Sequence, residues 1–111
     1  MMIPVVAQGM DIGLMQQRVI DNFTQALTLA PQNAYLYYNR ANVYAARGDY
    51  QKAIDDYDKA IECNASLPEA FFNRGLSYAN VGDKQQAVKD FSTAGQLGVY
   101  GAYNLIKQYS K

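Results

Sequence analysis

Residues 34–67 and 68–101 are two copies of one segment. When the chain is shifted by 34 positions against itself, ten residues of the segment coincide. The coincident pairs are Asn39/Asn73, Arg40/Arg74, Tyr44/Tyr78, Ala45/Ala79, Gly48/Gly82, Asp49/Asp83, Gln51/Gln85, Ala53/Ala87, Asp56/Asp90 and Ala60/Ala94. Self-similarity at a fixed period of this length predicts a stack of identical supersecondary units.

Each copy has the pattern of a helical hairpin. Tyr37, Ala41 and Tyr44 recur at spacings of three and four, which is the period of one helix face. Gly48 is expected to end this helix, because glycine adopts the left-handed conformation without a steric penalty. Asp49 follows at the N-cap position, where its carboxylate would accept hydrogen bonds from the free amides of the next helix. So short a turn makes the two helices antiparallel neighbours.

The second helix of the first copy begins at Tyr50, with an apolar face that includes Ala53, Tyr57 and Ala60. A break follows, in which Ser66 and Glu69 have the spacing of a capping box, and Pro68 suits a first helical turn. The sequence therefore predicts repeat units at 34–67 and 68–99 and a C-terminal capping helix at 100–111.

The N-terminal part is predicted to be half of such a unit. Residues 11–31 have the pattern of a second helix, since Phe23 aligns with Tyr57 at the same period. Residues 1–10 are expected to form an irregular strip, so the first helix of this unit is missing. The apolar face of the lone helix then needs a cover.

With these residues in place, the chain resembles a tetratricopeptide repeat (TPR) protein. The matching positions are Tyr37, Ala41, Tyr44, Gly48, Ala53, Tyr57 and Ala60 in one copy, and Phe71, Gly75, Tyr78, Gly82, Ala87, Phe91 and Ala94 in the other. The resemblance implies an all-α fold, a right-handed superhelix of antiparallel helix pairs with about five helices. The tail resembles the closing helix of bacterial proteins of this type, which predicts the C-terminal part of a longer bacterial array.

The resemblance also implies a concave groove, lined by the first helices, that binds an extended peptide or a partner helix. The face opposite the hairpin contact supplies the candidate groove residues Tyr35, Tyr38, Asn39, Asn42, Glu69, Phe72, Asn73, Leu76 and Asn80. An asparagine amide both donates and accepts, so Asn39 and Asn73 are suited to pairing with a peptide backbone. The alternative is that they are solvated or tie one helix to its neighbour.

Other groove features have two interpretations as well. Tyr35, Tyr38 and Phe72 are either hydrophobic anchors for a partner or packing between repeats. Arg40 and Arg74 either serve an acidic partner or lay their stems over aromatic rings with their heads in water. A clamp for a terminal carboxylate is not expected, because Glu69 places an acid on this face. The acidic run Asp55, Asp56 and Asp58 is expected to be a solvated helix face.

Composition argues against several functional classes. The ten basic and ten acidic residues cancel and interleave, which disfavours a nucleic-acid surface. There is no histidine, and the single Cys63 is expected to be a small buried residue. No nucleophile stands beside a base, and no metal-ligand cluster or phosphate loop is present. We therefore predict no catalysis, no cofactor, no metal site and no membrane span; with no signal peptide recognisable, cytoplasm is the default compartment.

Two functions remain from the sequence. The first is a non-catalytic protein-binding module or scaffold that uses the groove. The second is structural self-association, as a homodimer through residues 1–30 or by end-to-end stacking, because about three repeats are normally needed for stability.

Overall fold

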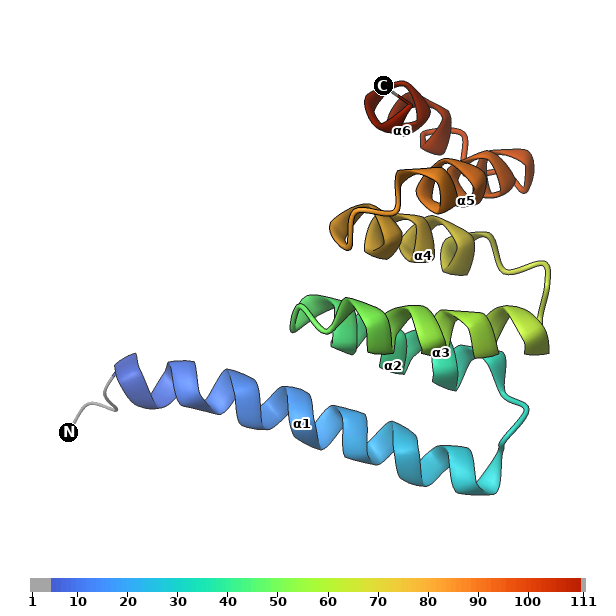
Figure 1. Cartoon of the computed structure of the whole chain (residues 1–111). Helices are drawn as coiled ribbons and strands as arrows, with labels where there is room; N and C mark the ends of the chain where they lie inside the picture. Colours follow the sequence, from blue (N-terminus) through green and yellow to red (C-terminus); the bar gives the residue numbers. More distant parts are fainter. Residues whose placement is uncertain (1–4, 111) are drawn as a thin grey trace.

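The computed structural model describes the backbone of residues 5–110 and the side chains of residues 12–110. Helices stack one after another from the N-terminus to the C-terminus of this range (Figure 1). They are α1 (Val5–Leu29), α2 (Ala34–Ala46), α3 (Tyr50–Cys63), α4 (Pro68–Asn80), α5 (Lys84–Gln96) and α6 (Ala102–Tyr109). The predicted all-α superhelix of antiparallel pairs is confirmed, with six helices in the described range against the expected five or so.

The two hairpins, α2–α3 and α4–α5, depend on small residues where their helices cross. Ala41 of α2 and Ala53 of α3 are completely buried in the same apolar cluster. In the other hairpin, a Cβ added at Gly75 would lie 2.7 Å from the ring of Phe91. The helices thus approach so closely that only glycine or alanine fits at the crossing.

Glycine ends both first helices, as predicted. Gly48 and Gly82 have φ angles of 85° and 88°, in the left-handed region. The predicted cap after Gly48 is wrong, however: Asp49 makes no side-chain capping bond and instead accepts from Nε and Nη2 of Arg47 at 3.1 and 2.7 Å. Asp83 has no such arginine beside it, and its carboxylate does cap α5 by accepting from the amide of Gln86 at 3.2 Å.

The predicted capping box before α4 is also wrong. Leu67 occupies the N-cap position without a side-chain bond, and Pro68 opens the helix as expected. The local turn is closed instead by Asn64, whose Oδ1 accepts from the amide of Ser66 at 3.0 Å. This bond closes the turn before α4 and leaves the first amides of the helix without a side-chain cap.

Helix α1 is longer than predicted. It begins at Val5, so the expectation of an irregular strip is wrong for residues 5–10, while residues 1–4 lie outside the described part. At the 34-residue period, α3 corresponds to residues 16–29 of α1. The additional N-terminal turns extend past the turn that joins α2 to α3 (Figure 1).

A repeated arginine contact ties successive units together. Arg40 of α2 donates from Nε and Nη2 to Asp56 of α3 at 2.7 and 2.8 Å, and from Nη1 to Thr24 of α1 at 3.0 Å. One period later, Arg74 makes the same bidentate pair with Asp90, and its Nη1 donates to Asp58 at 2.9 Å.

This contact corrects the predicted roles of its members. The acidic run is not a solvated face, since Asp56 is buried with 5 % exposure and Asp58 is engaged by Arg74; of the three acids, only Asp55 is exposed. The guanidinium groups do lie over aromatic rings, such as Tyr37 and Phe71. Their heads are nevertheless bonded to protein.

The electrostatics of the Arg74–Asp90 pair indicate that it contributes more to the orientation of the helices than to stability. The hydrogen bonds that Arg74 donates to Asp90 raise the pKa of Arg74, which keeps the guanidinium charged. Burial, the largest cause, and the nearby charge of Asp58 raise the pKa of Asp90 above its usual range, although Arg74 acts to lower it. Bringing the carboxylate out of water therefore offsets much of the attraction, and the pair chiefly fixes how the helices are oriented.

We expect Gly48→Ala to lower the free energy of unfolding by about 1–2 kcal/mol, because alanine is strained at positive φ. A Cβ at this position would meet nothing within 4 Å, so the loss reports backbone strain alone. Gly13→Ala is the matched control, since Gly13 is helical with open space around it. Urea denaturation should show no loss for Gly13→Ala, and equal losses at both positions would contradict the assignment.

Asp56→Ala should destabilise the fold by about 2–3 kcal/mol, because it leaves the partly buried Arg40 without its carboxylate. The neighbouring Asp55→Ala should change the free energy of unfolding by less than about 0.5 kcal/mol. Thermal and urea unfolding of the two variants check this. Similar values for both would mean that the Arg40–Asp56 pair does not hold the hairpin.

Candidate functional site: the inner groove

The first helices α2 and α4 contact each other as well as their own partners. A pocket of about 380 Å³ lies between them and α3, lined by Asn42, Ala45, Ala46, Tyr50, Tyr57, Asn73, Leu76, Ser77 and Asn80. It brings together four of the residues predicted for the groove: Asn42, Asn73, Leu76 and Asn80.

A polar cluster organises this pocket. Oδ1 of Asn42 accepts from the hydroxyl of Tyr57 and from Nδ2 of Asn73, the latter at 3.1 Å. Nδ2 of Asn73 also donates to the hydroxyl of Tyr38 at 3.1 Å. Burial raises the pKa of Tyr57, so its hydroxyl stays protonated as a donor. Asn73 therefore ties α4 to α2, the structural alternative considered for this residue.

Asn39 is in a different situation from its repeat equivalent. It is exposed, and its side chain makes no hydrogen bond with the described residues. Asn73 bonds to residues of the preceding first helix α2, whereas the described element before α2 is the second-type helix α1, which offers Asn39 no such partners. Asn39 and Asn73, which were predicted to act alike, therefore differ. The side-chain amide of Asn39 is available for a new hydrogen bond, whereas Nδ2 of Asn73 is already bonded.

The groove aromatics divide in the same way. Tyr38 packs on Tyr57 with ring centroids 6.1 Å apart, and Phe72 packs on Phe91 at 5.8 Å. Leu76 is half-buried against the second apolar cluster. Tyr35, by contrast, is 58 % exposed, so it is the aromatic of the set that is most open to a partner.

The remaining candidates and the charges complete the surface. Glu69 and Asn80 are exposed, and Nδ2 of Asn80 donates to the carbonyl of Leu76 at 2.9 Å. The cations of α2 and α4 are Arg40 and Arg74, and both are paired with aspartates. On α6, the exposed Lys107 stands at the register position of Asn39 and Asn73.

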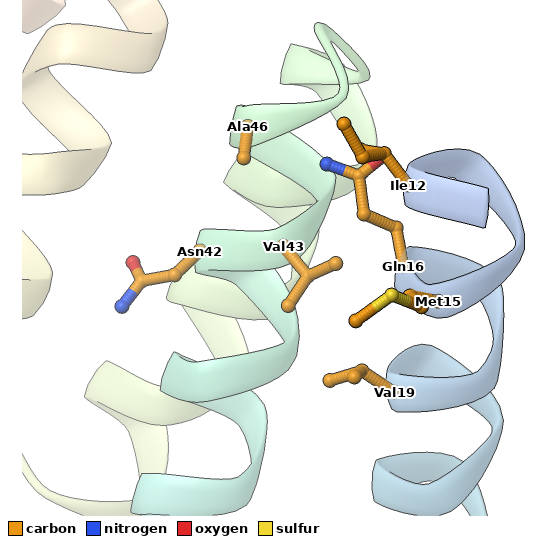
Figure 2. A pocket seen from close by; sticks show the side chains of 7 residues that line it. All are labelled: Ile12, Met15, Gln16, Val19, Asn42, Val43 and Ala46. Atoms are coloured by element: carbon orange, nitrogen blue, oxygen red, sulfur yellow. The ribbon is translucent and has the colours of Figure 1, made fainter. Parts of the chain in front are cut away.

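Sequence reasoning missed part of the lining. Tyr57 was assigned to the hairpin core only, and Ser77 was not considered, although its Oγ is buried without a hydrogen-bond partner among the described residues. A second, apolar groove was missed entirely. Its volume is about 370 Å³, and it lies between α1 and α2, with Ile12, Met15, Gln16 and Val19 facing Asn42, Val43 and Ala46 (Figure 2).

Figure 2 shows that Met15 and Val19 point from α1 toward Val43 of α2, while Asn42 points away from α1. Spacings of three and four between Ile12, Met15 and Val19 were available in the sequence as a signal.

Within residues 12–110 no group of three or more histidine, cysteine or acidic side chains is placed to hold a metal ion. No helix of the described range is long and apolar enough to cross a membrane.

Family models match most of the chain. Two models described as tetratricopeptide repeat match residues 22–55 and 69–96, and one described as TPR repeat matches residues 41–82. The first of these matches begins at residue 22, within the predicted half unit at residues 11–31. No curated protein sequence is significantly similar to the chain.

Solved structures share the fold over most of its length. The second TPR domain of Spaghetti (RPAP3), bound to the HSP90 peptide SRMEEVD, is 30% identical with a TM-score of 0.74, over 81% of this chain and 83% of that one. The second TPR domain of human RPAP3, in complex with the HSP70 peptide SGPTIEEVD, is 28% identical with a TM-score of 0.81, over 94% and 88%. MamA is 25% identical with a TM-score of 0.82, over 90% of this chain and 59% of that one. Together with the repeat-by-repeat match, these likenesses place the chain in the tetratricopeptide repeat family.

Proposed function

We propose that this chain is a non-catalytic protein-binding module that holds an extended peptide or a partner helix against the inner face of α2 and α4. The observation that carries the proposal is the cluster of Tyr38, Asn42, Tyr57 and Asn73, which fixes polar groups at the floor of an open groove. Preorganised polar groups lower the entropy lost on binding. The exposed Tyr35 adds an aromatic anchor at the rim.

The related structures support the class of ligand. The two RPAP3 domains each hold a short peptide, from HSP90 in one case and HSP70 in the other. This is why we favour a peptide segment over a folded surface as the ligand of the groove.

The charges of the groove favour a peptide whose chemistry differs from that of the acidic peptides SRMEEVD and SGPTIEEVD. Arg40 and Arg74 are paired with aspartates of the protein itself, and Glu69 is an acid. Lys107 of α6 is an exposed cation at the register position of Asn39 and Asn73. An exposed ammonium contributes about 0–1 kcal/mol to an ion pair. The groove should therefore prefer neutral or basic segments with apolar side chains to acidic C-terminal ones.

Self-association is the second candidate, favoured by the exposure of Ile12, Leu14 and Met15 on α1. Its end-to-end form would pair α6 of one copy with α1 of the next as a hairpin. That arrangement is disfavoured because Tyr109 stands in α6 at the register position of Ala41 and Gly75, and its ring packs on Phe91 with centroids 5.8 Å apart. A bulky residue at the crossing keeps a second helix away.

Peptides selected from a random display library on the immobilised chain test the main proposal. Tyr35→Ala and Asn80→Ala should each weaken the selected peptides about fivefold or more in fluorescence anisotropy. Tyr100→Ala is the matched control, because Tyr100 is 75 % exposed and lies beyond the groove, between α5 and α6. Equal effects of the three substitutions, or failure to select any peptide, would refute groove binding.

The carboxylate preference is checked with the peptide SRMEEVD, made with a free and with an amidated C-terminus. We expect the two affinities for this chain to differ by less than about fivefold, since a single exposed cation faces the peptide. A loss of more than about twentyfold on amidation, abolished by Lys107→Ala, would instead establish a carboxylate clamp.

A further inference from the structure

Ser77 of α4 carries a buried hydroxyl that has no hydrogen-bond partner among the described residues. The residue is 1 % exposed. Most buried polar groups in folded proteins are bonded, because a hydroxyl that is withdrawn from water without a partner loses its hydrogen bonds without replacement. The hydroxyl of Ser77 therefore lowers the stability of the unbound protein.

The packing of the helices does not require a hydroxyl at this position. The residue in the same register of α2 is Val43, which lines the apolar groove between α1 and α2 (Figure 2). An aliphatic side chain thus occupies the equivalent place one unit earlier. Ser77 differs from Val43 in its surroundings, because it lines the pocket of about 380 Å³ between α2, α3 and α4. The unpaired hydroxyl and the pocket of the inner groove therefore coincide.

The pocket presents both hydrogen-bond donors and acceptors. Oδ1 of Asn42 already accepts from two donors, so this side chain offers its Nδ2 as a donor. Nδ2 of Asn80 donates to the carbonyl of Leu76, which leaves Oδ1 of Asn80 as an acceptor. The hydroxyl of Ser77 can serve as either. A ligand group that both donates and accepts matches these side chains.

The lining of the pocket disfavours an ionised ligand group. No lysine, arginine, aspartate or glutamate lines it. Burial raises the pKa of Tyr57, so the hydroxyl of this lining residue is neutral as well. An ammonium or a carboxylate that entered the pocket would lose water without meeting an opposite charge. The ligand group that fits is therefore neutral.

From these observations we propose that the pocket receives the side-chain amide of an asparagine or glutamine of the bound peptide, and that Ser77 determines this specificity. The inference rests on the proposed function, since the peptide must lie in the groove between α2 and α4. A side chain is needed because Ser77 is buried at the floor, below a backbone that follows the groove. An amide carries a donor and an acceptor on one neutral group. The hydroxyl gains its missing bond only from a ligand with such a group, which discriminates against apolar analogues.

Peptides selected from the display library on the immobilised chain serve as probes. The tightest-binding sequence is synthesised as selected and with each asparagine or glutamine replaced in turn by leucine. All are titrated against the full chain, Ser77→Ala and Ser92→Ala by fluorescence anisotropy. Ser92 is the matched control, because it is a half-buried serine of the α5 helix that does not line the pocket.

We expect one asparagine or glutamine whose replacement by leucine weakens binding to the full chain about fivefold or more. The same replacement should cost Ser77→Ala at least about threefold less, because one partner of the hydrogen bond is already absent. Binding to Ser92→Ala should match binding to the full chain within about twofold.

Thermal unfolding without peptide separates this role from a purely structural one. Ser77→Ala should melt at a higher temperature than Ser92→Ala, because it removes an unpaired buried hydroxyl and both substitutions make the same change within a helix. A lower melting temperature for Ser77→Ala would overturn the inference. Bound peptides without an asparagine or glutamine coupled to Ser77 would overturn it too, and would leave groove binding intact. Failure to select any peptide would refute the proposed function and this inference with it.

Discussion

The second helices α3 and α5 each depend on a first helix that lies across their apolar face. The contact is possible only because glycine or alanine occupies the crossing, as at Ala41, Ala53 and Gly75. In a repeat stack each unit contacts only its neighbours, so stability is a sum of such local interfaces. Among the described helices, α1 is the one of the second type that no first helix covers, and its Val19 is 39 % exposed where Ala53 is fully buried. The same constraint explains why the aromatic residues at positions 57 and 91 are core, while Phe23 remains partly open.

The arginine–aspartate contact gives the stack its second constraint. Each arginine reaches the second helix of its own unit and the second helix of the unit before it, through Thr24 in one case and Asp58 in the other. This pairing fixes the relative placement of successive hairpins. It also removes two cations from the inner face, so a structural interaction decides the charge that a ligand meets. Under the proposed function, the charge preference of the groove would thus be set by residues that do not touch the ligand.

The sequence allowed much of the fold to be predicted, since the 34-residue period and the glycine turns are local patterns. The features that could not be predicted depend on contacts between helices or lie outside the repeat. Arg40 and Asp56 were both visible as recurring identities, yet their pairing over sixteen positions requires the crossing geometry of two helices. The cap at Asp49 failed because Arg47, which has no counterpart in the second unit, competes for the carboxylate. The extra turns of α1 lie outside the repeat register, so the period carried no information about them.

The two asparagines show why the copies of a repeat are not functionally equivalent. Asn39 and Asn73 are identical in type and register, and a reading by motif assigns them one role. In the structure Asn73 is held by the first helix of the unit before it, whereas the described residues before α2 contain only the second-type helix α1, and Asn39 has no such bond. The bonds of Asn73 to Tyr38 and Asn42 hold its amide in one orientation at the floor of the groove. The side chain of Asn39 is exposed and makes no hydrogen bond with a described residue, so its donor and acceptor are both available for a new bond. Two identical residues at one register position can therefore contribute to binding in different ways, one as a fixed group and the other as an adaptable one.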